Sequence, residues 1–363
     1  MKILYIVPKI NNEGGVARVL SVKANYLIKK LGYEVHILTQ NKGNFPLFYS
    51  FSKKIFFHDM ILKGSYFQFI NEYRKALMNK IKAISPDVIL ICDNGMKAYM
   101  IPFILKTKIP IIFESHGSIY IEEKQKHKFQ FSTKLKLVFK DYSANKFTKF
   151  IALSNESLKE WNVTNGVIIP NPLWFNTNQF SNLKSKRVIV VSRNSYEKGL
   201  DRMLKVWQKV IQKNPEWMLD IYVKPNDNRE IQTLVNSLNI RGNVMFHEPV
   251  KNINDKYIES SILVMTSRTE GFGMVLIEAM ACGLPVLAYD CPVGPRSIIT
   301  NNENGFLIED GNIDLFVEKL NLLIENENLR IEMGNKAKEN SNRYNLDTIM
   351  LQWKNLFEDL IKD

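Results

Sequence analysis

The sequence TEGFGMVLIEAMACGLPV occupies residues 269–286 and follows the unbroken apolar run ILVM at residues 262–265. Its glycines predict a tight loop, and the apolar residues after them predict a helix that starts near Gly273 and stops at Gly283. The apolar run at residues 285–288 then predicts the next strand. A strand, a glycine loop, a helix and a second strand form the repeating unit of a parallel α/β sheet.

The same alternation extends along the whole chain. Short runs rich in Ile and Val alternate with longer segments of helical period, which is typical of parallel strands buried on both faces between crossover helices. The pattern occurs twice, so we predict two doubly wound, Rossmann-like domains in tandem. The other predicted strands are residues 3–7, 35–38, 88–91, 109–113, 150–153, 188–191, 219–223 and 244–246.

Chain length and linker composition also predict two domains. The 363 residues exceed what one hydrophobic core usually organises. Residues 170–185 are dense in Pro and Asn without periodicity, as in a linker. We predict an N-terminal domain over residues 1–172, a C-terminal domain over residues 173–345, and a helix over residues 346–363 that packs back towards the first domain. Open α/β sheets bind ligands at the carboxyl ends of their strands, so we expect the site in the cleft between the domains.

The composition is that of a soluble globular protein. It is 45% hydrophobic and 24% charged, which excludes a wholly disordered, collagen-like or coiled-coil chain. No apolar run approaches the roughly 18 residues of a membrane span, and the N-terminus lacks the features of a signal peptide. The three cysteines show no metal-type spacing. These features predict a protein of the reducing cytoplasm.

The positive charge is concentrated in the first half of the chain. Residues 1–180 contain 26 Lys and Arg against 12 Asp and Glu, whereas the remainder contains 23 against 25. From Lys124 to Lys149 there are eight lysines interleaved with Phe and Tyr. This segment fits an anionic membrane surface, with peripheral binding at the inner face of the cytoplasmic membrane, or else a solvated helix face. No zinc, RNP or other nucleic-acid-binding motif occurs, so nucleic acid is not the expected partner.

Two glutamates flank the predicted helix start near Gly273. The start of a helix presents free N–H groups and a partial positive charge, which suits a phosphate. Glu270 lies in the loop and Glu278 about one turn into the helix. One carboxylate can then contact a sugar on one side of a diphosphate, and the other a ribose on the far side. An isolated pair of this kind would equally fit a surface loop glutamate and an exposed helix glutamate.

The pair is part of a longer motif. Residues 270–286 match the pattern Glu-Gly-Phe-Gly-x-x-x-x-Glu-Ala-x-Ala-x-Gly-x-Pro-Val. In this pattern the chain resembles the retaining glycosyltransferases of family 4 (glycosyl transferases group 1), which have the GT-B fold of two facing Rossmann-like domains. Residues 290–295 are similar to the Cys-Pro-Thr-Gly-Pro loop of members that build surface polysaccharides. The resemblance covers almost the whole chain.

The resemblance implies which residues hold the donor. Arg193 and Lys198 would bind the diphosphate, because two fixed cations stabilise the charge of a departing nucleoside diphosphate without a metal. Glu278 would hold the ribose and Glu270 the sugar hydroxyls. The remaining implied donor contacts are Gly15 near the phosphates, the backbone of Val250 at the base, and Gly271, Phe272, Gly273, Met274 and Val275 around the phosphates.

His116 completes the implied catalytic set, which also contains Glu270, Arg193 and Lys198. It lies at the end of a first-domain strand, where the family places a histidine beside the transferred sugar. The chain departs from the family at residues 224–228, where Lys-Pro-Asn-Asp-Asn replaces a Gly-x-Gly turn that borders the nucleotide. The contacts of the base are therefore the part of the implied site that the motifs specify least.

The implied function is a retaining, metal-independent transfer of a hexose or N-acetylhexosamine. The donor would be a nucleotide-sugar, most of all a UDP-sugar, and the acceptor a lipid-linked glycan in the biosynthesis of a bacterial polysaccharide such as capsule or lipopolysaccharide. The nucleotide-sugar is a substrate, so no cofactor is expected, and no Asp-x-Asp metal motif follows a predicted strand. Two alternatives remain: a sugar-nucleotide epimerase on the same fold, and a non-catalytic member that binds glycan or membrane.

Overall fold

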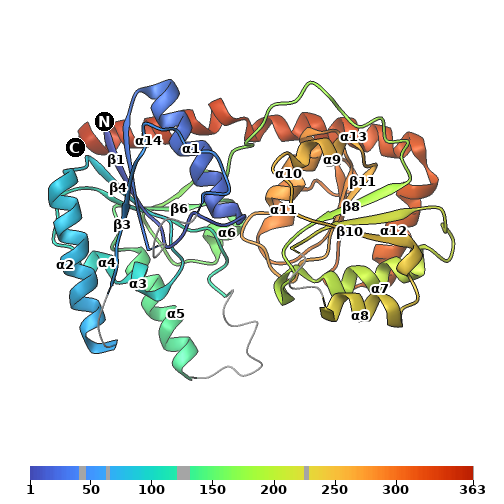
Figure 1. Cartoon of the computed structure of the whole chain (residues 1–363), viewed down its shortest axis with the longest axis horizontal. Helices are drawn as coiled ribbons and strands as arrows, with labels where there is room; N and C mark the ends of the chain where they lie inside the picture. The colour runs from blue at the N-terminus through green and yellow to red at the C-terminus, as the bar shows by residue number, and fades with distance from the viewer. Residues whose placement is uncertain (41–45, 63–65, 121–130, 225–228, 363) are drawn as a thin grey trace. The chain divides into compact units, whose positions relative to one another are not determined.

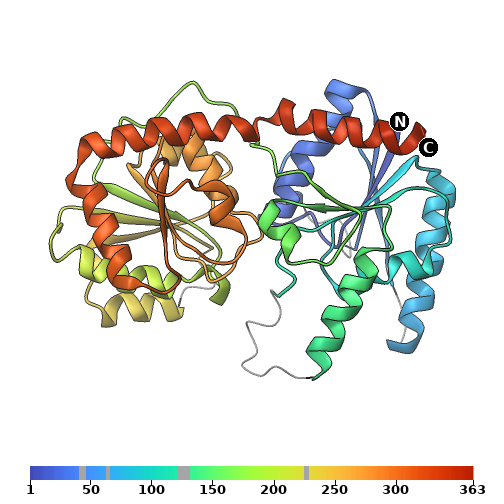
Figure 2. The same cartoon turned by 180° about the vertical axis from the view of Figure 1, so that it is seen from behind.

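The computed structural model describes residues 1–40, 46–62, 66–120, 131–224 and 229–362. The chain folds into two compact units, coloured along the chain in Figure 1. Unit 1 comprises Met1–Trp174 together with Leu346–Asp363, and unit 2 comprises Phe175–Asn345. The C-terminal helix thus belongs to the same unit as the N-terminal strand, and Figure 2 shows the two chain ends close together.

Unit 1 contains a parallel seven-stranded sheet of order β3-β2-β1-β4-β5-β6-β7. Its strands are β1 (Lys2–Ile6), β2 (Glu34–Thr39), β3 (Phe56–Asp59), β4 (Val88–Ile91), β5 (Ile111–Glu114), β6 (Lys149–Ala152) and β7 (Gly166–Ile168). Its helices are α1 (Gly15–Leu31), α2 (Tyr66–Ile84), α3 (Met96–Tyr99), α4 (Ile101–Ile104), α5 (Phe131–Ala144), α6 (Asn155–Lys159) and α14 (Leu346–Lys362).

Helices cover both faces of this sheet, so its inner strands β1, β2, β4, β5 and β6 are largely buried. In Figure 1, α1 and α14 lie on one face, and α2 and α5 lie on the other. Trp353 and Phe357 of α14 pack in one core with Tyr5 of β1. Tyr73 and Leu77 of α2 pack in the core on the opposite face. The apolar stripe of α14 is therefore a structural part of unit 1.

Unit 2 contains a parallel six-stranded sheet of order β10-β9-β8-β11-β12-β13. Its strands are β8 (Arg187–Val191), β9 (Met218–Tyr222), β10 (Val244–His247), β11 (Ile262–Met265), β12 (Val286–Tyr289) and β13 (Gly305–Ile308). Its α-helices are α7 (Leu200–Val210), α8 (Arg229–Ser237), α9 (Ile253–Ile258), α10 (Met274–Ala281), α11 (Gly294–Ile298), α12 (Ile313–Glu325) and α13 (Glu327–Ser341), and its short 3₁₀ turns are η1 (Tyr196–Lys198), η3 (Arg241–Asn243) and η4 (Asn342–Tyr344).

Helix α10 lies deep in unit 2 because it is apolar on nearly every side. Leu276, Ile277 and Ala279 are fully buried. Helix α13 packs closely against its end, since a Cβ on Gly334 would lie 2.3 Å from the carbonyl oxygen of Gly283. This burial fixes the position of the first turn of α10, which carries the glycine motif.

The predicted class, two Rossmann-like α/β domains, is confirmed, and every predicted strand is present within two residues of its expected ends. The sequence did not predict β3, β7 and β13, which all lie at sheet edges. Strands β3 and β7 are covered less completely than the inner strands, and in β13 the apolar run after Gly305 is short. Across the described residues, no helix combines the length and the apolar character needed to span a membrane.

Candidate functional site

The topology of unit 2 gathers three of the predicted residues at one edge of the sheet. Strand order reverses between β8 and β11, so the loops after these strands diverge and leave the crevice in which α/β sheets bind ligands. Arg193 and Lys198 follow β8, and Glu270 follows β11.

Lys198 and Glu270 are joined directly. Nζ of Lys198 donates to Oε1 of Glu270 at 2.6 Å, and Oγ of Ser267 donates to the same oxygen at 2.6 Å. Glu270 is buried and Lys198 half-buried. Glu270 is therefore a fixed acidic group, which excludes the alternative of a solvated loop glutamate.

The loop after β8 is held against the loop after β11 by a second contact. Gly199 adopts a left-handed φ of 63°, and a Cβ there would lie 2.2 Å from the carbonyl oxygen of Thr266. Oγ1 of Thr266 donates to the carbonyl oxygen of Gly199 at 2.9 Å. Only glycine combines this backbone conformation with such a close approach, which explains the glycine after Lys198.

A salt bridge that the sequence did not reveal secures the same two loops. Both guanidinium Nη atoms of Arg268 donate to the carboxylate of Asp201, at 2.9 and 2.6 Å. The Arg268 amide donates to the carbonyl oxygen of Glu197 at 2.7 Å, and its guanidinium stacks on the ring of Tyr196. Burial opposes the charge of Asp201, but Arg268 holds the pKa of that carboxyl below its usual value. The pairing depends on three-dimensional proximity, and no sequence motif marks it.

The first turn of α10 lies directly after these loops. Gly273 caps it with a left-handed φ of 97°, and a Cβ on Gly294 would lie 2.6 Å from the carbonyl oxygen of Phe272. The amides of Met274 and Val275 belong to the first turn, where N–H groups have no acceptor within the helix. They provide an anion-binding end beside the Lys198–Glu270 pair.

Glu278 is 4% exposed, on the buried side of α10. The hydroxyl of Tyr257 in α9 donates to its Oε2 at 3.0 Å. This position excludes the alternative of an exposed helix glutamate. Burial of a carboxylate is costly unless hydrogen bonds compensate, so Glu278 is a pre-oriented acceptor.

Arg193 is exposed, and its guanidinium has no ion pair or hydrogen bond among the residues that the structure describes. It follows β8 directly, at the same edge as Lys198. Val250 follows β10, which is two strands or about 10 Å from β8. It lines a cavity of about 430 Å³.

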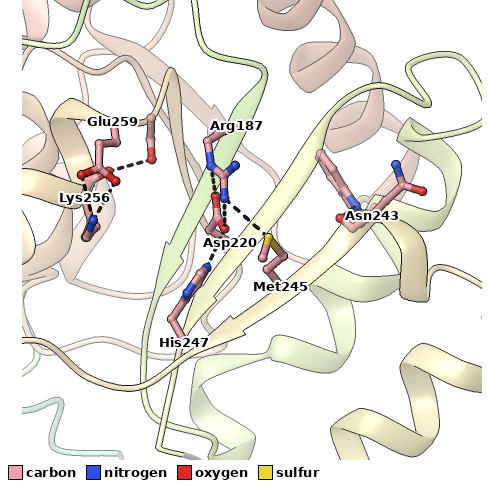
Figure 3. Close-up of polar contacts among 9 residues, drawn as sticks. Arg187, Asp220, Asn243, Met245, His247, Lys256 and Glu259 are labelled. Atoms are coloured by element: carbon pink, nitrogen blue, oxygen red, sulfur yellow. Dashed lines mark hydrogen bonds and ion pairs between the residues drawn. The ribbon is translucent and has the colours of Figure 1, made fainter.

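This cavity also contains a charged cluster on β8, β9 and β10. Arg187 donates to both oxygens of Asp220 at 2.7 Å, and Nε2 of His247 lies 2.7 Å from Oδ1 of Asp220 (Figure 3). The His247 ring stacks on Tyr222 with centroids 4.6 Å apart. No sequence motif assigned a role to these residues, and their mutual pairing satisfies most of their polar groups.

In unit 1, the strand order reverses between β1 and β4. Gly15 begins α1 after β1 and is exposed, and nothing lies within 4 Å of the place where its Cβ would be. It therefore leaves open space at the start of that helix.

His116 follows β5, and its side chain is only 6% exposed. Its Nε2 lies 3.6 Å from Oε1 of Glu114, which in turn accepts hydrogen bonds from Lys23. Burial lowers the pKa of His116, the charge of Glu114 raises it, and the charge of Lys23 lowers it again. The pKa of His116 is therefore below its usual value, and the ring is neutral at pH 7. The sequence identified His116 but gave Lys23 and Glu114 no role.

Comparison with known proteins identifies the family. Residues 13–173 match the family described as Glycosyltransferase Family 4, and residues 175–340 match the family described as Glycosyl transferases group 1. The chain is 30% identical to an uncharacterized glycosyltransferase of Haemophilus influenzae, over 98% of this chain and 99% of that protein. It is 27% identical to the amylovoran biosynthesis glycosyltransferase AmsD of Erwinia amylovora, again over 98% and 99%.

Solved structures share the fold at low sequence identity. The sucrose-phosphate synthase of Thermosynechococcus elongatus superimposes with a TM-score of 0.84 at 18% identity, covering 99% of each chain. HepE of Anabaena, solved with UDP-glucose, gives 0.78 at 18% identity, covering 99% of this chain and all of that one. These neighbours are glycosyltransferases of the GT-B fold. The chain therefore belongs to the group 1 glycosyltransferases of family 4 and has their GT-B fold.

Proposed function

We propose that this glycosyltransferase moves a hexose or N-acetylhexosamine from a UDP-sugar to a glycan acceptor in bacterial polysaccharide biosynthesis. The observation that carries the proposal is the Lys198–Glu270 pair beside the exposed Arg193 and the first turn of α10. Cations, a fixed carboxylate and free amides at one sheet edge match the phosphates and hydroxyls of a nucleotide-sugar.

Lys198 can serve the diphosphate and Glu270 together. An ammonium group has three donors, and one of them is used by Glu270 in the structure. The others are available to a phosphate oxygen, with Arg193 and the amides of residues 271–275 completing the binding of the diphosphate. When the sugar leaves, the charge on the diphosphate grows, and these groups stabilise it without the reorganisation that water would need. The transfer would need no metal ion.

The two glutamates would bind the ribose and the transferred sugar of the donor. Glu278, oriented by Tyr257, would accept hydrogen bonds from the ribose hydroxyls. Glu270, fixed by Lys198 and Ser267, would accept from the hydroxyls of the transferred sugar. Val250 would contact the base through its backbone.

From unit 1, the neutral His116 would hydrogen-bond the transferred sugar, and the open space at Gly15 would admit the phosphates. We propose that the acceptor hydroxyl attacks the anomeric carbon from the same face that the diphosphate leaves. The departing diphosphate would itself guide the acceptor proton. The configuration at the anomeric carbon would then be retained, and no protein nucleophile would be needed.

Relatives support a polysaccharide acceptor. One is the amylovoran enzyme already described, and another is the poly(ribitol-phosphate) alpha-N-acetylglucosaminyltransferase of Staphylococcus aureus, 28% identical over 77% of this chain. A third, the lipopolysaccharide 1,6-galactosyltransferase of Salmonella typhimurium, is 33% identical over 38%. We propose that the acceptor of this chain is lipid-linked.

Helix α5 supports a membrane-facing role. Leu135, Val138 and Tyr142 recur at helical spacing and are 63%, 66% and 54% exposed, with exposed Lys136 on the same helix. An apolar stripe with basic neighbours suits an anionic membrane surface. Of the aromatic residues in the predicted segment, Phe147 is instead buried in the core, and residues 121–130 lie outside the described part of the chain.

A thermal-shift panel of UDP, GDP, ADP, CMP and dTDP, each with EDTA or Mg²⁺, tests the donor. A nucleotide at 100 times its Kd adds about 2.7 kcal/mol to the free energy of unfolding and raises Tm by a few degrees. We expect UDP to raise Tm by the same amount in EDTA and in Mg²⁺. Transfer from UDP-sugars to lipid-linked acceptors is then followed by mass spectrometry, and the anomeric configuration of the product by NMR. A response to another nucleotide alone would contradict the UDP assignment.

A further inference from the structure

Lys23 of α1 and Glu114 at the end of β5 form an ion pair inside unit 1. Nζ of Lys23 donates to both carboxylate oxygens at 2.7 Å, and the two side chains are 1% and 2% exposed. The indole ring of Trp353 in α14 covers the ammonium, with its centroid 3.6 Å from Nζ. The buried pair thus joins α1 to β5 and is covered by α14, three elements that are far apart in the sequence.

The pair lies next to His116, whose Nε2 is 3.6 Å from Oε1 of Glu114. Two further titratable groups face the same carboxylate. Sγ of Cys92, after β4, lies 3.4 Å from Oε2 of Glu114. The negative charge of Glu114 also raises the pKa of Tyr5 in β1. Burial raises the pKa of both the thiol and the phenol, so both groups are neutral. The charges that act on His116 are therefore those of Glu114 and Lys23.

Stability alone does not account for this arrangement. The cost of removing two charges from water offsets most of their attraction, and apolar side chains of similar volume often serve a core as well. Glu114 also lies two residues before His116, at the edge where α/β sheets bind their ligands. Its cost and its position both indicate a role at the site.

We propose that Lys23 and Glu114 are positioning residues that orient the ring of His116, and that Trp353 excludes water from them. The inference rests on the proposed function, in which His116 contacts the transferred sugar. The physical basis is the balance of two opposite charges. Glu114 alone would draw a proton to His116, and Lys23 alone would repel one. Together they fix the ring through the carboxylate while adding no net charge.

The test uses NMR titration of the histidine rings, with His116→Gln to assign the His116 signal. Glu114→Gln leaves Lys23 unpaired, so we expect the titration midpoint of His116 to fall by about one pH unit or more. Lys23→Met leaves Glu114 unpaired, and the carboxylate then shares a proton with His116, so the midpoint should rise. The double variant Lys23→Met/Glu114→Gln removes both charges and should return the midpoint towards that of the wild type.

Lys23→Arg is the conservative control, because it keeps the charge and should keep the midpoint. If Lys23→Met does not fold, Glu114→Gln, Lys23→Arg and the double variant still decide the question. Shifts in the same direction for both single variants, or an unchanged midpoint in Glu114→Gln, would overturn the proposal. A merely structural pair would destabilise the fold in both variants and leave the kcat of the folded variants unchanged.

A kinetic readout connects the pair to the reaction. Glu114→Gln should lower kcat at least tenfold and leave the KM for the donor within about twofold, because Glu114 is not among the proposed contacts of the diphosphate and ribose. The NMR titration needs no substrate. A wild-type protein that transfers no sugar would therefore contradict the proposed function, while the titration would still test the positioning of His116.

Discussion

Nζ of Lys198 and Oε1 of Glu270 lie 2.6 Å apart although their residues follow different strands of the second sheet. The strand order, which reverses between β8 and β11, brings the two loops together, and Gly199 allows their backbones to approach closely. The pair combines a cation for a phosphate with an acceptor for a sugar hydroxyl. Each member holds the other in place before a ligand arrives.

Lys198→Ala should leave the fold intact and reduce kcat/KM at least a hundredfold, because it removes a diphosphate contact and releases Glu270. Steady-state kinetics with a UDP-sugar measure the loss. Lys209 pairs with Asp314 on the surface of unit 2, so Lys209→Ala is a matched control that should keep wild-type kinetics. Equal effects of the two variants would exclude Lys198 from the site.

Glu278→Ala should likewise cut turnover at least a hundredfold, since the ribose loses its acceptor in a buried position. Tyr257→Phe tests the orientation of that acceptor, because it removes the hydroxyl that donates to Oε2 and keeps the ring. We expect this variant mainly to weaken UDP binding, by about tenfold, which corresponds to roughly 1.4 kcal/mol. Calorimetric titration with UDP measures it, and unchanged affinity in both variants would contradict the assignment.

Gly199→Ala should destabilise the protein by about 2–3 kcal/mol, because it adds a Cβ at a left-handed φ of 63° and 2.2 Å from the carbonyl oxygen of Thr266. Gly242 is the matched control. Its Cβ would meet nothing within 4 Å, so Gly242→Ala should change stability little. Urea unfolding measures the stability of both variants. Similar urea midpoints for Gly199→Ala and Gly242→Ala would show that the loop around Gly199 accommodates the methyl group.

The sequence predicted the motif-bearing parts of the site better than its supporting contacts. Glu270, Glu278 and Lys198 stand in contiguous motifs, and these local patterns also fix the strands and helices that carry them. Arg268 and Asp201 support the same loops but are 67 positions apart. Lys23 and Glu114 are 91 positions apart, and Trp353 joins them from the other end of the chain. Such pairs form only on folding, so no local sequence pattern predicts them.

The stability of unit 1 should fall when the pH drops below 6.5, because burial lowers the pKa of His116 in the folded state. The unfolded chain then binds a proton that the folded chain does not, and stability is lost as the pH falls from 6.5 towards the folded-state pKa. His58 contributes in the same direction, since burial lowers its pKa as well. His116→Gln should therefore reduce, without abolishing, the decrease of Tm between pH 7 and pH 5.

A second decrease is expected below pH 4.5. Burial opposes the charge of Glu114, but Lys23 and His116 hold the pKa of that carboxyl below its usual value, so its stabilisation is present above pH 4.5 and lost as the pH falls through the folded-state pKa. In Lys23→Met/Glu114→Gln this acid-dependent part should disappear. A Tm series from pH 7 to pH 3 separates the two steps, and an unchanged low-pH slope in the double variant would contradict the contribution of Glu114.

Leu135→Ser/Val138→Ser should weaken binding to vesicles that contain anionic phospholipid, because both side chains are largely exposed on α5 and would enter the interface. Leu351 of α14 is 55% exposed, and Leu351→Ser is a matched control that removes apolar surface elsewhere in unit 1. Co-sedimentation with anionic and neutral vesicles, at low salt and at 1 M salt, measures the effect. We expect wild type and Leu351→Ser to bind anionic vesicles and to lose much of that binding at 1 M salt, where charge interactions are screened within about 3 Å. Binding that is equal in all three proteins would place the membrane contact outside α5.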